Sequence, residues 1–130
     1  MFNDATGVCN FQGLSRDQQL EWLQAITGFG ITGDELSKVL LPRWTTMMRI
    51  ALLLHGWSYK DDTNPLRCYE PLPDGPFKGE KVDKAVETNL IQAFYKTLGW
   101  DSQGVPTTAT LATHGFSAYD AAMAPLRANA

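Results

Sequence analysis

The feature that most limits the possible folds of this chain is a recurrence of apolar residues at the helical period of about 3.6 residues. The periodic segments begin at capping residues and end at glycines. Ser15 and Gln18 form a capping-box pattern, and Gly28 ends the segment that follows. A second, longer segment opens at Thr32 and ends near Gly56. No stretch shows a convincing strand-like alternation of apolar and polar residues, so the pattern predicts an all-α, multihelical fold.

Two more helices are predicted in the second half of the chain. Residues 82–98 repeat the helical period and are followed by Gly99, and residues 107–114 form a short capped segment before Gly115. In the longer helix of the first half, Pro42 removes an amide donor and crowds the preceding turn, at a cost of about 3 kcal/mol. We therefore expect a kink or a break there.

A long proline- and glycine-rich loop is predicted over residues 58–79. Its turn-forming pairs, such as Asn64-Pro65 and Asp74-Gly75, favour neither a helix nor a strand ladder. Loops of this length in compact domains are commonly functional or wrap a neighbour. The loop is therefore a candidate contact segment.

Length and charge exclude several classes of protein. The 130 residues suffice for one compact domain, and the net charge of -3 comes from interspersed acids and bases. No basic patch suits a nucleic acid or an anionic membrane, and no apolar run approaches the roughly 18 residues of a membrane span. The start of the chain lacks a secretory pattern. We expect a cytoplasmic protein without nucleic-acid or membrane partners.

A short pattern near the start of the chain could contact a bound group. Asp4, Gly7 and Cys9 offer a carboxylate acceptor, close backbone approach and a soft thiolate. By itself the pattern also fits an inert buried thiol. Cys68, the other cysteine, lies far away in sequence and receives no role. The two are more consistent with free thiols or ligands than with a disulfide, although the pairing stays open.

Several segments together resemble one family. Residues 94–101, 104–107 and 111–116 resemble the C-terminal end of the tungsten-containing aldehyde:ferredoxin oxidoreductase family. Its members carry Tyr-Tyr-x-x-Arg-Gly-Trp-Asp, Gly-Ile-Pro-Thr and Leu-x-x-Leu-Gly-Leu patterns there. Residues 31–33, 60–65 and 71–79 match further family segments in the same order. Linked motifs in the right order are far more specific than any one of them.

The resemblance implies a site at the start of the chain. Cys9 would be the fourth thiolate of a four-iron, four-sulfur cluster beside a tungsten bis-pterin cofactor. Asp4 would accept hydrogen bonds from the pterin, and the backbone of Gly7 and Val8 would line the same wall. Residues 1–13 would then form a cofactor-binding loop, and residues 14–130 a helical body. The full enzyme would oxidise aldehydes to carboxylic acids and pass electrons to ferredoxin.

The chain departs from the family in ways that limit what it does alone. Leu98 replaces an arginine and Leu52 an asparagine, and neither position is a cofactor ligand. The family's three-cysteine motif, second pterin-binding segment and catalytic acid and histidine are missing from this sequence. We therefore expect the chain to correspond only to the last domain of such an enzyme, with the enzyme's other domains as its partners. The isolated chain should be inactive and hold no cofactor. It should also tend to self-associate. The alternative is a non-catalytic helical interaction module that retains this scaffold.

The remaining polar candidates are expected to be structural. His55 and His114 each precede a helix-ending glycine, where histidine meets the carbonyl end of a helix favourably. Asp61 and Asp62 are expected to form a turn or capping pair rather than a catalytic dyad. No set of acid, base and nucleophile can be assembled from the sequence, so no catalytic residue is assigned.

Overall fold

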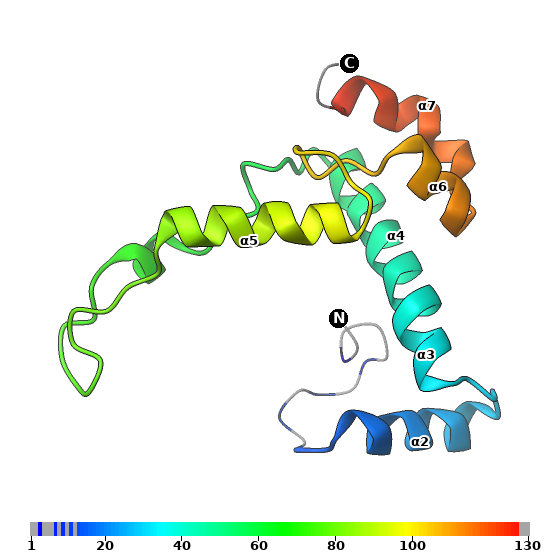
Figure 1. Ribbon diagram of the computed structural model, residues 1–130, viewed down its shortest axis with the longest axis horizontal. Coiled ribbons are helices and arrows are strands. Elements are labelled where there is room, and N and C mark those ends of the chain that lie inside the picture. Colours follow the sequence, from blue (N-terminus) through cyan, green and yellow to red (C-terminus); the bar gives the residue numbers. More distant parts are fainter. Residues whose placement is uncertain (1–2, 4–6, 8, 10, 12, 128–130) are drawn as a thin grey trace. The chain divides into compact units, whose positions relative to one another are not determined.

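The computed structural model describes residues 3, 7, 9, 11 and 13–127. It consists of two compact units, Met1–Met48 and Arg49–Ala130. Among the described residues the regular structure is helical, and the β pairing is a single isolated bridge between Trp100 and Pro106 (Figure 1). The predicted all-α class is confirmed. The expectation of one domain over residues 1–130, with a loop at 1–13, stays a prediction.

The first unit begins with the capped helix that the sequence predicted. Helix α2 spans Arg16–Thr27, and its N-cap Ser15 forms a full capping box with Gln18. The Gln18 amide donates to Ser15 Oγ at 3.3 Å, and the Ser15 amide donates to Gln18 Oε1 at 2.9 Å. Gly28 ends the helix in the left-handed conformation.

The second helical stretch absorbs its proline without a break. Helix α3 (Gly33–Glu35), a π-helical segment (Leu36–Leu40) and α4 (Leu41–Leu54) follow one another directly (Figure 1). The Leu41 amide donates to the carbonyl of Leu36, five residues earlier. Such a π turn widens the helix and is a known site of irregularity. The irregularity expected at Pro42 is therefore the π-helical turn that precedes the proline, and the helix is not broken.

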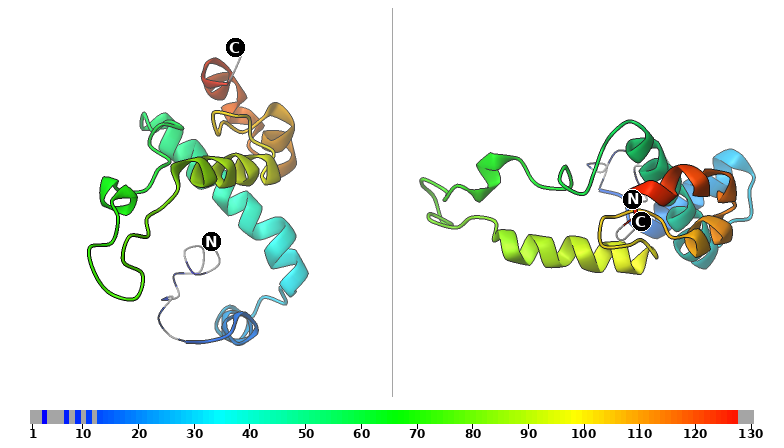
Figure 2. Two further views of the ribbon diagram at one scale, coloured as in Figure 1. Left: turned by 60° about the vertical axis from the view of Figure 1, so that its left-hand side comes forward. Right: turned by 90° about the horizontal axis from the view of Figure 1, so that it is seen from above.

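The long loop of the second unit is ordered by its own backbone bonds. The Leu72 amide donates to Glu80 O and the Gly79 amide to Leu72 O, each at 2.9 Å. Figure 2 shows the loop doubling back on itself before the next helix. A 3₁₀ helix, Leu66–Tyr69, lies inside it. The expectation that this stretch holds no helix is thus wrong for those residues.

The later helices lie close to the residues where the sequence predicted them. Helix α5 spans Lys84–Thr97, with Asp83 as its N-cap, and α6 spans Thr108–His114, with Thr107 as its N-cap. Three short segments complete the described chain: the 3₁₀ turns Ser117–Tyr119 and Ala124–Leu126, and helix α7, Asp120–Met123, between them.

Two apolar clusters form the core of the second unit. The larger one joins α4, α6, α7 and the turn before α6, and its buried members are Ile50, Leu53, Val105, Leu111 and Met123. The smaller one joins α5 to the turn after it through Tyr95, Leu98 and Trp100. Between them, the clusters include residues of helices α4, α5, α6 and α7.

A buried ion pair links α4 to the long loop. The Arg49 side chain is 4% exposed and that of Asp62 is 21% exposed. Arg49 Nη2 lies 2.7 Å from Asp62 Oδ2, and Arg49 Nη1 donates to Asp62 Oδ1 at 2.9 Å. Arg49 Nε donates to the carbonyl of Gly104 at 2.8 Å. The guanidinium therefore holds three segments together through a planar fork that lysine could not supply.

Aromatic side chains complete the surroundings of this ion pair. Asp62 accepts further hydrogen bonds from Tyr95 Oη and, at 2.9 Å, from Trp57 Nε1. Burial by itself would raise the pKa of Asp62, but the bonds from Arg49, Tyr95 and Trp57 together hold that pKa below its ordinary value. The Arg49 guanidinium also lies over the rings of Tyr95 and Trp100, 5.5 and 5.6 Å from their centroids.

Gly104 is required by the same cluster. Its φ is +69°, and a Cβ at this position would lie 2.5 Å from Arg49 Nη2 and 2.7 Å from Tyr95 Cζ. A side chain would therefore meet both the left-handed backbone and two buried groups. By contrast, Gly115 has a φ of +77° with no atom within 4 Å of an added Cβ.

The substitution Gly104→Ala should lower the free energy of unfolding by about 3 kcal/mol, because overpacking adds to the backbone penalty. Gly115→Ala, the matched control, should cost about 1 kcal/mol, since it meets the backbone penalty alone. Urea unfolding of the two variants and the parent chain measures the difference. Equal losses would show that the Arg49 cluster does not need the space at Gly104.

The substitution Asp62→Asn should lower the free energy of unfolding by about 2 kcal/mol at neutral pH, because it leaves Arg49 buried without its counter-charge. The folded pKa of Asp62 is lowered, so its contribution is complete above the ordinary pKa of 3.8 and is lost as the pH falls through the folded pKa. The gap between parent and variant should therefore narrow at acidic pH. Urea unfolding across a pH series tests this, and a gap independent of pH contradicts it.

Candidate functional site

The segment that carries the predicted cofactor residues is described in part. Asp4 and Val8 lie outside the described residues. Gly7 has a φ of +72°, with no atom within 4 Å of an added Cβ, and Cys9 is exposed with a thiol that forms no disulfide. Gly7 and Cys9 are thus compatible with a ligand-bearing turn, and the roles of all four residues stay predictions.

A complete metal site is not found in the described part of the chain. No group of three or more His, Cys, Asp or Glu side chains there could hold a metal ion. An iron–sulfur cubane is held by four thiolates. Cys9 by itself would supply one of those four ligands.

Cys68 lies apart from any such ligand set. It is half-buried, forms no disulfide and lines a pocket of about 300 Å³ together with charged side chains of the long loop, among them Arg67 and Lys81. No contact in this pocket gives Cys68 a chemical role, and it serves below as a control.

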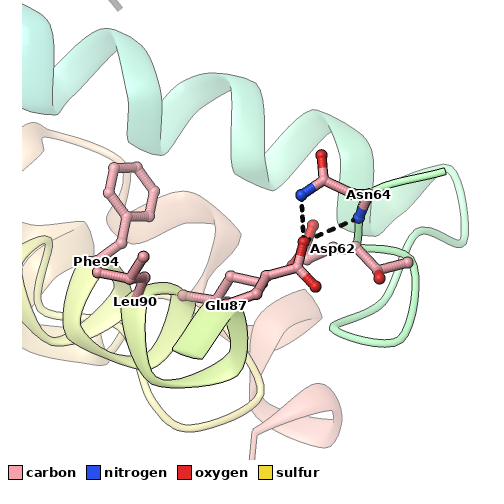
Figure 3. Close-up of a pocket in the computed structure, with 7 residues that line it drawn as sticks. Asp62, Asn64, Glu87, Leu90 and Phe94 are labelled. Carbon is pink, nitrogen blue, oxygen red and sulfur yellow. Dashed lines mark hydrogen bonds between the residues drawn. The ribbon is translucent and has the colours of Figure 1, made fainter. Parts of the chain in front are cut away.

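A pocket of about 370 Å³ lies between the long loop and α5. Figure 3 shows Asp62 and Asn64 facing Glu87, with Leu90 and Phe94 further along the helix. The loop contributes Asp62, Thr63 and Asn64, and α5 contributes Glu87, Leu90, Ile91 and Phe94. The pocket thus has a polar end at the loop and an apolar end on the helix.

Hydrogen bonds occupy the carboxylates of this pocket. Glu87 Oε1 accepts from the Asn64 amide at 3.1 Å and from Asn64 Nδ2 (Figure 3), and Glu87 Oε2 accepts from Tyr69 Oη. The bond from Tyr69 contributes most to lowering the pKa of Glu87, and the bonds from Asn64 add to it. Glu87 and Asp62 therefore act as charged anchors that fix the loop to the helices.

The two neighbouring aspartates have different roles. Asp61 accepts from the amide and hydroxyl of Ser58 at 2.8 and 2.9 Å, as a turn-capping residue does. This half of the sequence interpretation is correct. Asp62 instead pairs with buried Arg49. Sequence reasoning missed this ion pair because the two partners are 13 residues apart. The Lys-Asp-Asp-Thr family segment was the one signal that pointed to this position.

Other expected structural roles are met in part. His55 Nδ1 contacts the carbonyl of Ala51 at 2.9 Å, at the end of α4. A search of the described helices finds none with the length and apolar content of a membrane span.

A family model described as aldehyde ferredoxin oxidoreductase, domains 2 and 3, matches residues 1–116 of the chain. The match includes the predicted cofactor segment, the long loop and the motifs at the end of α5 and on α6. It agrees with the resemblance that these motifs suggested.

Curated relatives come from Pyrococcus. An aliphatic sulfonate oxidoreductase, WOR-like subunit, of Pyrococcus furiosus is 34% identical over 116 residues, which make up 85% of this chain and 19% of that protein. A tungsten-containing aldehyde ferredoxin oxidoreductase of Pyrococcus horikoshii is 32% identical over 104 residues, or 78% of this chain and 17% of the relative. The chain spans less than a fifth of their length. It belongs, as a C-terminal domain, to the aldehyde ferredoxin oxidoreductase family of enzymes.

Proposed function

We propose that this chain is the C-terminal domain of a tungsten-pterin, iron–sulfur oxidoreductase that oxidises aldehydes to carboxylic acids. The family match and the relatives named for tungsten and aldehydes support this proposal. In the assembled enzyme, the other domains supply the substrate chemistry, ferredoxin accepts the electrons, and the reaction takes place in the cytoplasm.

The chain's own contribution is part of the cofactor site. Cys9 supplies the fourth thiolate of the four-iron cluster, and Asp4 accepts hydrogen bonds from the pterin. The backbone of Gly7 and Val8 lines the same wall. The observation that carries this assignment is the exposed thiol of Cys9, which forms no disulfide and lies two residues after a glycine with positive φ and no atom within 4 Å of an added Cβ. When bound, the cluster carries electrons, and the chain's task is to hold it in place.

The 130-residue chain alone should bind neither iron nor tungsten after anaerobic purification, because one thiolate cannot hold a cluster. It should lack the broad visible absorbance of an iron–sulfur centre. Metal analysis and absorption spectroscopy measure both properties. Stoichiometric iron and tungsten in the isolated chain would contradict the shared-site proposal.

In the assembled oxidoreductase, Cys9→Ser should reduce the iron content and remove or alter the electron paramagnetic resonance signal of the reduced cluster, because a thiolate ligand is lost. Cys68→Ser is the matched control and should leave both unchanged. A Cys9→Ser enzyme that keeps full iron content and an unaltered signal would exclude Cys9 as a ligand. Circular dichroism of both variants separates a ligand effect from a failure to fold.

A further inference from the structure

Helix α5 carries two apolar faces, of which its own unit covers one. Tyr95 and Leu98 are buried against Trp100, and half-buried Ile91 packs beside them. The second face is a stripe at four-residue spacing, which places its members one above another on the helix. The stripe consists of Val86, Leu90 and Phe94, which are 55%, 66% and 40% exposed.

The polar groups beside this stripe already have partners. Glu87 accepts from Asn64 and Tyr69, and Asp62 is paired with Arg49. Among the apolar side chains, Phe94 packs edge-on against Trp100, with ring centroids 5.9 Å apart. Val86 and Leu90 stay more than half exposed in this unit. An apolar centre with a satisfied polar edge is the usual composition of a protein interface.

Two residues of the stripe also line a pocket. Leu90 and Phe94 line the apolar end of the 370 Å³ pocket, away from the loop residue Asn64 (Figure 3). The pocket has room for an apolar side chain from outside the unit. Figure 3 shows Leu90 and Phe94 on the same side of the helix.

We propose that the stripe Val86–Leu90–Phe94 is the surface on which an apolar segment of the remaining oxidoreductase polypeptide docks, with one of its side chains in the neighbouring pocket. This inference rests on the proposed function. The length of the relatives indicates what covers the stripe, since they match this chain over only 17–19% of their own sequences. More than four fifths of such an enzyme thus lies outside this chain and is available to cover the stripe.

Cysteine labelling tests the proposal directly. Leu90→Cys is introduced into the assembled oxidoreductase and into the 130-residue chain, with Asn89→Cys as the control on an exposed neighbouring position. In the assembled enzyme, a maleimide should modify Leu90→Cys at least about tenfold more slowly than in the dilute chain, because a docked segment covers it. Asn89→Cys should react at similar rates in both. Peptide mass analysis assigns the label to position 89 or 90.

Three results would overturn the proposal. Free reaction of Leu90→Cys in the assembled enzyme would show that nothing covers the stripe. Protection in the dilute chain would assign the stripe to residues 1–48 of the same chain. Protection that increases with the concentration of the chain would show that a second copy of the chain covers the stripe. A failure of this docking proposal can be told apart from a failure of the proposed function. Labelling rates do not depend on which cofactor is bound, whereas metal content does.

Discussion

The second unit depends on the pairing of Arg49 with Asp62. Removing a guanidinium and a carboxylate from water costs desolvation free energy. That cost is offset here because almost every donor and acceptor of the pair has a hydrogen-bond partner. One cluster thereby fixes α4, the long loop, α5 and the turn at Gly104. The Arg49 guanidinium also lies over the rings of Tyr95 and Trp100, so the ion pair adjoins the smaller apolar cluster.

The elements that the sequence predicted well are those set by local chemistry. The capping box at Ser15, the cap at Thr107 and the positive-φ Gly99 each depend on contacts within a few residues. The Arg49–Asp62 pair was not predicted, because no local pattern links residues that meet only after folding. The π turn before Pro42 was also missed. Propensity indicates that a proline disturbs a helix but not how the chain relieves the disturbance.

The candidate site was predicted from a different kind of signal. Physical chemistry alone left Cys9 with two possible roles, and the linked family motifs decided which one to propose. The reason is structural, since a thiolate that shares a cluster with other domains has no partner of its own to reveal it. Residue-level reasoning is strongest where a site is complete within one chain, whereas the site proposed for Cys9 would be shared with other domains.

The long loop is attached to the rest of its unit at its base, and its tip is held by its own backbone. Bonds from Asn64 and Tyr69 to Glu87, and from the Val82 amide to Cys68 O, fasten the loop at its base. Beyond them, the stretch around residues 71–80 closes on itself through the backbone of Leu72. Because these anchors lie at the base, a substitution at the tip would leave the attachment of the loop to α5 in place.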